Sequence, residues 1–473
     1  MVLSIDQVME LSKTYNVIPL IEAMLADTET PIRVYQRMQK QPYAFLLESV
    51  DEQRKQGRYS FIGTDPLFIL RGKNGVTVLH ENGQQHAIQE DPMAAMKILM
   101  KRYRSPYLAE LPAFSGGAVG YIGYDLIQQL EQIPRHRKDD LGMYDLHFMM
   151  VSEFVVFDHH MQQMQVVVNL HLPDEADEDL IQILYQEAAL RLKRLKRRAT
   201  APLAQERLND VDLAEHSITD TTLTEDRSAR SAFIEKVKCA QQHMQTGEIR
   251  ELFLSHRMEQ PTYVPPLDAY RVLRATNSSP YMYCMKMDEE TIIGSASESF
   301  SKAGEENEVF LTFKADDESI GDRKEDDFNQ LLARFPSERL VGSPKLHAIH
   351  LLAELEDTAR GTFGGAIGYL SFNGCSDACG MDQSIIFKHG KTYVQAGATI
   401  HKDSDPEEVY QETLNQALAL LEKVETAAQV FRSNMIENRS ISTRINPYPR
   451  FSHVNMDYFT MESMDEMERG TLG

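Results

Sequence analysis

Short apolar runs alternate with turn-forming residues from the N-terminus to about residue 190. Runs such as YAFLLESV (43–50) and MMVSEFVVF (149–157) have the length and the aromatic and β-branched content of strands. Later strands are expected at Leu252–Ser255, Met282–Met287 and Thr291–Ile293. The pattern therefore predicts a β-rich protein with a smaller number of helices.

Two segments have the period of amphipathic helices. The first has four apolar residues on one face, and Gly247 is placed to end it. The second begins at Asp405 as N-cap, with Pro406 in the first turn and Glu408 at the third position. The two apolar stripes are Phe233, Val237, Ala240 and Met244, and Tyr410, Leu414, Ala417 and Leu421.

An internal echo joins two distant segments. GGAIGYLSF at Gly364–Phe372 resembles GGAVGYIGYD at Gly116–Asp125, 248 residues earlier. Glycine pairs beside small and aromatic residues are typical of strands whose backbones approach closely. The echo predicts two related halves, or two matching layers of one large β-rich body.

A polar stretch divides the chain. Residues 199–230 carry few large apolar side chains, which favours a surface linker. Beyond about residue 430 no period is sustained. We therefore predict an N-terminal half at 1–198, a linker at 199–230, a C-terminal half at 231–426 and a poorly ordered tail at 427–473.

The composition is that of an ordinary soluble globular protein, with 42% hydrophobic and 25% charged residues. The net charge of −22 disfavours binding to nucleic acids or anionic membranes, and we read the basic run at Arg191–Arg198 as the solvated end of a helix. No run reaches the length of a membrane span, and the N-terminal residues do not have the pattern of a signal peptide. The four cysteines lack zinc-like spacing, so free thiols and a cytoplasmic location are expected.

Seven strings occur in an order typical of one enzyme family. They are LLESV (46–50), GRYSFIG (57–63), GEIRELFLSHR (247–257), NSSPYMY (277–283), GSPK (342–345), GGAIGYLSF (364–372) and YVQAGATIHKDSDPEEVYQET (393–413). Together they resemble the large, chorismate-using subunit of anthranilate synthase, over most of Leu46–Val424.

This resemblance implies an α/β (α+β) fold, a β-sandwich with two intertwined related halves and peripheral helices. It also implies an enzyme that converts chorismate and ammonia to anthranilate and pyruvate with Mg²⁺. A separate glutamine amidotransferase subunit would supply the ammonia, and L-tryptophan would inhibit from a distinct site.

The motifs of the implied tryptophan site are well kept. The resemblance assigns this site to Ser49 in LLES and to Pro280, Tyr281 and Met282 in SPYM. The Ser49 hydroxyl and backbone groups suit the charged ends of an amino acid, while Met282 suits an indole ring. Without the resemblance, the same residues would be read as a strand end and a turn packed in a core.

The implied chorismate site is less complete. The resemblance assigns it to Tyr369 and to Gly397, Ala398 and Thr399, where the family has Gly-Ala-Gly. We expect a small-residue turn there, whose backbone N–H groups receive a carboxylate. The arginine expected to grip a carboxylate aligns with Gln383, which removes a charge-assisted hydrogen bond of roughly 1.5–3 kcal/mol.

The implied Mg²⁺ site has one candidate, Glu412 in YQET, which lies off the apolar stripe of its helix and also fits a solvated glutamate. The second carboxylate motif of the family is missing, near residues 330–336, and residues 313–317 replace its Pro-Ile-Ala-Gly-Thr segment. A threonine aligns with Arg339 and a lysine with Gln416. The histidine of the family is absent from its place, although a similar string, RFSHV, holds His453 in the tail.

Two alternatives to an anthranilate synthase stay open. The kept tryptophan motifs beside altered chorismate motifs also fit a non-catalytic relative that binds tryptophan or the amidotransferase subunit and regulates. An aminodeoxychorismate synthase is the third interpretation, because a lysine marks that subgroup near Lys314, where the alignment has no fixed register.

Overall fold

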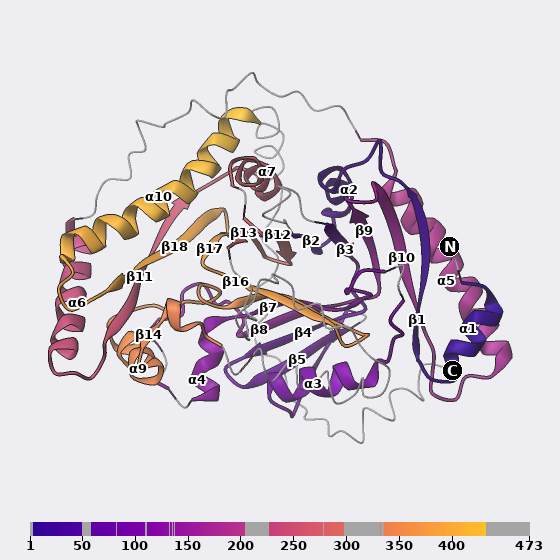
Figure 1. The fold of residues 1–473 in the computed structure, drawn as a ribbon, viewed down its shortest axis with the longest axis horizontal. Coiled ribbons are helices and arrows are strands. Elements are labelled where there is room, and N and C mark those ends of the chain that lie inside the picture. The colour runs from indigo at the N-terminus through magenta and orange to yellow at the C-terminus, as the bar shows by residue number, and fades with distance from the viewer. Residues whose placement is uncertain are drawn as a thin grey trace.

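The computed structural model describes residues 3–49, 58–81, 83–108, 111–131, 133–134, 136, 138–203, 227–277, 279–297, 332 and 335–431. Two antiparallel sheets form its interior, and most of the helices lie outside them (Figure 1). This mixed sandwich confirms the predicted fold class. None of the described helices is both long enough and apolar enough to span a bilayer.

The larger sheet has eleven strands within the described residues. Every neighbouring pair in it runs antiparallel. In sheet order the strands are β1 (Val17–Leu25), β10 (Gln163–His171), β9 (Glu153–Asp158), β3 (Tyr59–Thr64), β2 (Tyr43–Ser49), β12 (Tyr281–Met287), β13 (Glu290–Ala296), β17 (Gln383–Lys388), β18 (Lys391–Ile400), β11 (Glu251–Pro261) and β14 (Gly342–Ser343).

The smaller sheet lies across the inner face of the larger one (Figure 1). In sheet order it consists of β16 (Ser376–Gly380), β15 (Ala366–Ser371), β7 (Gly117–Ile122), β8 (Leu146–Val151), β4 (Phe68–Lys73), β5 (Val76–Glu81) and β6 (Gln84–Ile88).

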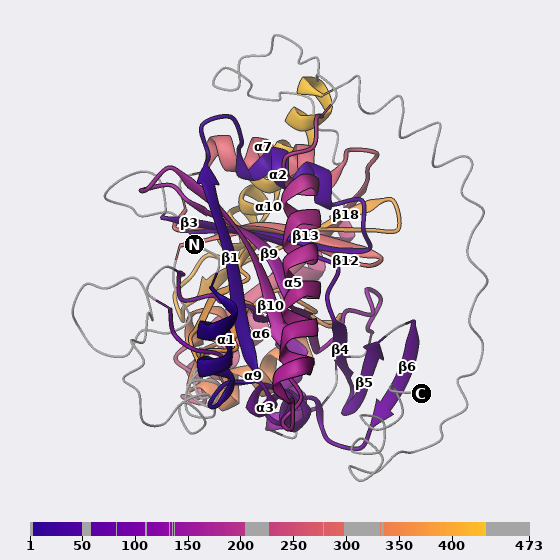
Figure 2. The ribbon, with the colours of Figure 1, turned by 90° about the vertical axis from the view of Figure 1, so that its right-hand side faces the viewer.

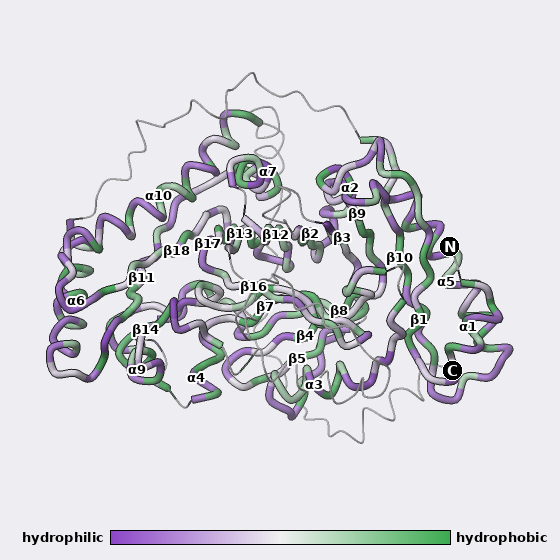
Figure 3. The backbone as a smooth tube through the Cα atoms, viewed as in Figure 1, coloured by the Kyte–Doolittle hydropathy of each residue, from purple (hydrophilic) through white to green (hydrophobic). Residues whose placement is uncertain are grey.

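Helices cover the outer faces of both sheets. Helix α5 lies along β10 and β1, as Figure 2 shows, while α10 covers β18 and α3 lies under β4. The helices are α1 (Ile5–Ser12), α2 (Pro31–Met38), α3 (Pro92–Arg102), α4 (Ile127–Leu130), α5 (Glu178–Ala199), α6 (Arg227–Gln245), α7 (Pro266–Thr276), α9 (Lys345–Leu355) and α10 (Pro406–Val430). Hydrophilic stretches alternate with hydrophobic ones along peripheral helices such as α10 (Figure 3).

Strands from both halves of the chain share each sheet. In the larger sheet β2 pairs with β12, and in the smaller sheet β7 pairs with β15. Neither half therefore completes a sheet by itself. The prediction of two intertwined halves is confirmed.

The two echo segments are direct neighbours. Gly120 stands opposite Gly368 in the β7–β15 ladder, Ala118 opposite Leu370 and Ile122 opposite Ala366. Superposing one segment on the other interchanges the two outer pairs. The segments are therefore related by a local twofold axis that passes between Gly120 and Gly368. A Cβ on Gly120 would lie 2.1 Å from the His147 carbonyl oxygen, and one on Gly368 would lie 2.0 Å from the Asp377 carbonyl oxygen. Glycine is required at both positions because the flanking strands leave no space.

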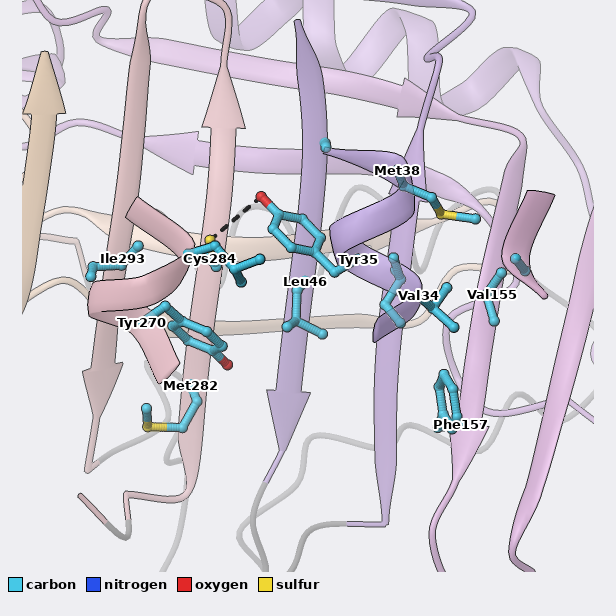
Figure 4. Packing of buried hydrophobic residues seen from close by; sticks show 14 of the residues in the cluster. Val34, Tyr35, Met38, Leu46, Val155, Phe157, Tyr270, Met282, Cys284 and Ile293 are labelled. Carbon is cyan, nitrogen blue, oxygen red and sulfur yellow. Dashed lines mark hydrogen bonds between the residues drawn. The ribbon is translucent and has the colours of Figure 1, made fainter. Parts of the chain in front are cut away.

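Buried side chains fill three layers. One group lies between the sheets, and a second lies between the larger sheet and its helices. The third packs the smaller sheet against α3 and continues to α6, α9 and the β11 end of the larger sheet. Figure 4 shows part of an outer group, where the Cys284 thiol donates to the Tyr35 hydroxyl oxygen at 3.4 Å and Met282 lies near the Tyr270 ring. All four cysteines are free thiols in the structure.

The predicted helices and strands are present. Asp405 caps α10 by accepting from the backbone N–H groups of Glu407 and Glu408, as the sequence predicted. The basic run forms the last turns of α5, where Arg191 pairs with Glu153. Two boundaries differ from the predicted ones, because α6 begins at Arg227 and α10 continues to Val430. Residues 204–226 and 432–473 lie outside the described residues.

Replacing Gly368 by alanine tests how closely the neighbouring strand backbone approaches β15 at this residue. We expect Gly368→Ala to lower the free energy of unfolding by about 3 kcal/mol or more, because the new methyl group meets backbone rather than a movable side chain. Denaturant unfolding measures the change. Ala366→Gly, two residues earlier in β15, is the matched control and should cost about 1 kcal/mol. An equal cost for both variants would contradict the close approach.

Candidate functional site

Strand β18 has an edge without a strand partner in the described structure. Its ladder with β17 ends at Val394, opposite Ile385, whereas its ladder with β11 continues to Ile400. Residues 395–400 are therefore paired on one edge only, within the part of the chain that the structure describes. The prediction of a small-residue turn at Gly397–Thr399 was wrong, because these residues lie inside a strand.

The alternation of the ladder fixes where the N–H groups of this segment point. The Ser255 N–H donates to the Glu356 carboxylate at 2.9 Å, on the side of β11 away from β18. Ser255 and Gly397, which stand opposite each other, therefore form a non-hydrogen-bonded pair. It follows that the N–H groups of Gly397 and Thr399 point to the open edge of β18. Along a strand these two N–H groups are roughly 6.8 Å apart, so each can donate to a different oxygen of a bound anion.

Gly397 also lies under an aromatic ring. A Cβ there would be 2.5 Å from a Phe253 ring carbon and 2.6 Å from the Leu254 carbonyl oxygen. Phe253 stands directly opposite Thr399, and its ring stacks at 6.2 Å on Phe363. The face of β18 beside the open edge therefore has no space for a side chain at Gly397.

The buried Glu356–Arg360 ion pair contacts β11 beside this face. Arg360 is fully buried and donates to both Glu356 oxygens at 2.7 and 2.8 Å, as well as to the carbonyl oxygens of Leu340 and Phe253. Burial by itself would raise the pKa of Glu356, but the Arg360 guanidinium holds that pKa below its usual value. Since removing one partner of a buried pair leaves an uncompensated charge, the two residues stabilise each other strongly.

A second carboxylate joins this network from the smaller sheet. Asp125 accepts from the Gly361 N–H at 2.7 Å, and His136 lies between Asp125 and the Glu356 carbonyl oxygen. Burial raises the pKa of Asp125 to about 6, although nearby His136 opposes the rise. The other echo segment has Asn373 in the equivalent place, and it contacts the Ala113 carbonyl oxygen at 3.0 Å.

Sequence reasoning missed Glu356, Arg360, Ser255 and Gln395. The spacing of Glu356 and Arg360, four residues apart beside the Gly-Gly motif, was the available signal. Asp125 stood inside the echo, where it differed from its Asn373 counterpart.

Gln383 lies near the open edge but in another set of bonds. Its Oε1 accepts from the Ser295 hydroxyl at 3.2 Å, and Ser295 in turn accepts from Asn277 at 2.8 Å. Arg339 pairs with Asp382, the residue before Gln383. The arginine that the resemblance led us to expect is thus replaced by a neutral amide, with a guanidinium beside it that is already paired.

Tyr369 lies away from Gly397, between the sheets. Its ring contacts Phe114 at 4.8 Å and Phe61 at 5.8 Å. Tyr281 reaches the same layer, where its hydroxyl donates to Asp377 at 3.1 Å. Asp377 stands opposite Tyr369 in the β15–β16 ladder. The structure therefore brings Tyr369 close to Tyr281 of the tryptophan motif.

The four residues assigned to tryptophan lie together but not on one face. Ser49 is opposite Tyr281 in the β2–β12 ladder, and Met282 is opposite Glu48. Tyr281 packs between the sheets, whereas Met282 packs toward α7 on the outer face, and Pro280 is buried just before the strand. Because side chains alternate along a strand, the Ser49 hydroxyl and the Met282 side chain point to opposite faces.

The residues assigned to Mg²⁺ do not form a site in the described structure. Glu412 is exposed on α10 and accepts only from Gln416, at 3.3 Å. No group of three or more His, Cys, Asp or Glu side chains is placed to hold a metal ion in the described residues. The described residues by themselves therefore make no Mg²⁺ site, and we derive no step through a metal. His453 and residues 313–317 lie outside the described residues.

The Asp377 carboxyl provides a pH test of the inner layer. Burial raises its pKa to about 7 from the ordinary value of 3.8, against the hydrogen bond from Tyr281. The folded state then binds this proton more tightly than the unfolded chain, so its stabilising effect is lost as pH rises from about 4 to about 7. We expect Asp377→Asn to flatten the fall in unfolding free energy over that range. Tyr281→Phe, which removes no group that titrates over that range, is the control, and an unchanged slope in Asp377→Asn would refute the raised pKa.

The exposed position of Glu412 gives another test. We expect Glu412→Ala to change the free energy of unfolding by less than about 0.5 kcal/mol and to leave any magnesium dependence of turnover intact. Leu421→Ala, on the buried face of the same helix, should cost about 2–5 kcal/mol in the same unfolding measurement. Loss of magnesium-dependent turnover in Glu412→Ala would show that Glu412 binds Mg²⁺ as the resemblance implied.

Comparison with known proteins agrees with this architecture. The model of the chorismate binding enzyme family matches residues 43–312 and 322–422. The chain is 33% identical to anthranilate synthase component 1 of Acetivibrio thermocellus, over 90% of this chain and 99% of that protein. It is 29% identical to the protein of the same name from Geobacillus stearothermophilus, over 89% and 96%.

Solved structures show the same fold. Anthranilate synthase component I from Streptococcus pneumoniae TIGR4 superposes with a TM-score of 0.59 at 24% identity, over 84% of this chain and 99% of that one. MenF, the menaquinone-specific isochorismate synthase from Escherichia coli, gives 0.54 at 14% identity, over 89% and 98%. Given the family match and the 33% identical relative, the chain belongs to the chorismate binding enzyme family, among proteins similar to anthranilate synthase component 1.

Proposed function

We propose that this protein is the large subunit of an anthranilate synthase, which converts chorismate and ammonia to anthranilate and pyruvate. The similarity to anthranilate synthase component 1, over nearly the whole length of that relative, carries the proposal. A glutamine amidotransferase subunit would supply the ammonia, L-tryptophan would inhibit, and the cytoplasm would be the location. Mg²⁺ belongs to the same proposal, although the described residues give it no site.

The open edge of β18 supports the substrate assignment. Chorismate carries two carboxylates, and the N–H groups of Gly397 and Thr399 can each donate to a different oxygen of the bound molecule. Main-chain donors held in a sheet cost little reorganisation when a ligand binds. Gln383, at the start of the neighbouring strand, would add a neutral donor to the same ligand rather than a charged one.

The regulatory alternative has its own supporting observation. Four residues come together between the sheets, where the Tyr281 hydroxyl donates to Asp377. They are Ser49, Tyr281, Tyr369 and Asp377. A protein with this group intact and a weakened chorismate site would bind tryptophan without turning over chorismate. Aminodeoxychorismate synthesis stays a third interpretation, since Lys314 lies outside the described residues.

Product fluorescence tests the proposed function. With chorismate, ammonium chloride and Mg²⁺, we expect the purified protein to form anthranilate, and we expect L-tryptophan to lower the rate. Omitting ammonium is the control. The chain holds no tryptophan residue, so fluorescence of added L-tryptophan reports binding without background. Tryptophan binding without any product would favour the regulatory alternative, and aminodeoxychorismate as the product would favour the third.

A further inference from the structure

The side chain of Gln395 is buried on the inner face of β18, two residues before Gly397. It is 8% exposed, and its Nε2 donates to the Ser255 hydroxyl at 2.8 Å. Its Oε1 is also buried, and no hydrogen-bond donor reaches it from the described residues. An unpaired buried acceptor of this kind costs about 1–3 kcal/mol.

The neighbouring bonds fix which way the amide points. The Ser255 hydroxyl has a single proton, and it donates that proton to Glu356 Oε1 at 2.7 Å. It can therefore only accept from Gln395, which requires Nε2 to face Ser255. Turning the amide over would bring two acceptors together, so Oε1 stays directed away from Ser255.

Glu356 in turn holds Ser255 in place. The carboxylate accepts from both the N–H and the hydroxyl of Ser255 and is paired with buried Arg360. The unpaired Oε1 is therefore a rigidly supported acceptor rather than a free side-chain end. Such support is what a binding group needs to hold a small molecule in one orientation.

The chemistry of the open edge selects the occupant. The N–H groups of Gly397 and Thr399 are donors, and they suit an anion. Gln395 Oε1 is an acceptor on the same strand, and it requires a molecule with N–H or O–H. Of the two reactants, chorismate has a single O–H donor beside its ionised carboxylates, whereas ammonia carries three N–H bonds and one lone pair.

We propose that Gln395 Oε1 accepts an N–H hydrogen bond from ammonia and so directs the nitrogen lone pair toward bound chorismate. The inference rests on the proposed function. Gln395 gains no proton and forms no covalent bond, so its part is to position one of the two reactants.

The test uses the purified full-length chain with ammonium chloride as the nitrogen source. Gln395→Met keeps the length of the side chain and removes the acceptor. We expect it to raise the KM for ammonium about fivefold to tenfold while the KM for chorismate stays unchanged. Gln411→Met, the same change at an exposed residue of α10, is the matched control. We expect it to change the KM for ammonium less than about twofold.

Each other result overturns the inference. An unchanged KM for ammonium in Gln395→Met, or equal changes in both variants, would mean that Oε1 makes no specific contact with ammonia. A rise in the KM for chorismate alone would mean that a chorismate hydroxyl occupies the acceptor. If Gln395→Met fails to fold by its melting curve, Gln395→Asn moves the same amide back by one carbon and should give the same selective rise. A wild-type chain that forms no product from chorismate and ammonium overturns the proposed function together with this inference.

Discussion

The antiparallel contact between β7 and β15 is the constraint on which the rest of the structure depends. Gly120 and Gly368 let these strands and their neighbours approach at distances that no side chain allows. The contact joins strands that are 248 residues apart in the sequence, and β2 and β12 make a second join in the larger sheet. Because both halves contribute to both sheets, they must fold together.

This joining also determines where polar groups meet. Asp125 follows β7 and accepts a hydrogen bond from the Gly361 N–H, just before β15. The pairing of β7 with β15 therefore brings Asp125 to the Glu356–Arg360 pair. That pair holds Ser255 on β11 and, through it, Gln395 on β18. The open edge of β18 is thus supported by four segments of the chain, which gives a rigid place for a substrate.

Much of the fold could be predicted from the sequence, because its signals are local. The N-cap at Asp405, the apolar stripe of α10 and the glycine echo each needed only a few neighbouring residues. The pairing of the echo segments and the network around Glu356 depend on contacts across more than one hundred residues. The turn expected at Gly397 was wrong for a related reason, since small residues served there to admit the Phe253 ring rather than to reverse the chain.

The central claim is that chorismate binds along the open edge of β18. Hydrogen exchange of the peptide spanning Gln395–Ile400, measured by mass spectrometry with and without chorismate, tests it most directly. The account predicts slower exchange at the Gly397 and Thr399 amides when chorismate is present. Protection confined to the peptides around Ser49 and Tyr281, with no change at Gln395–Ile400, would contradict it.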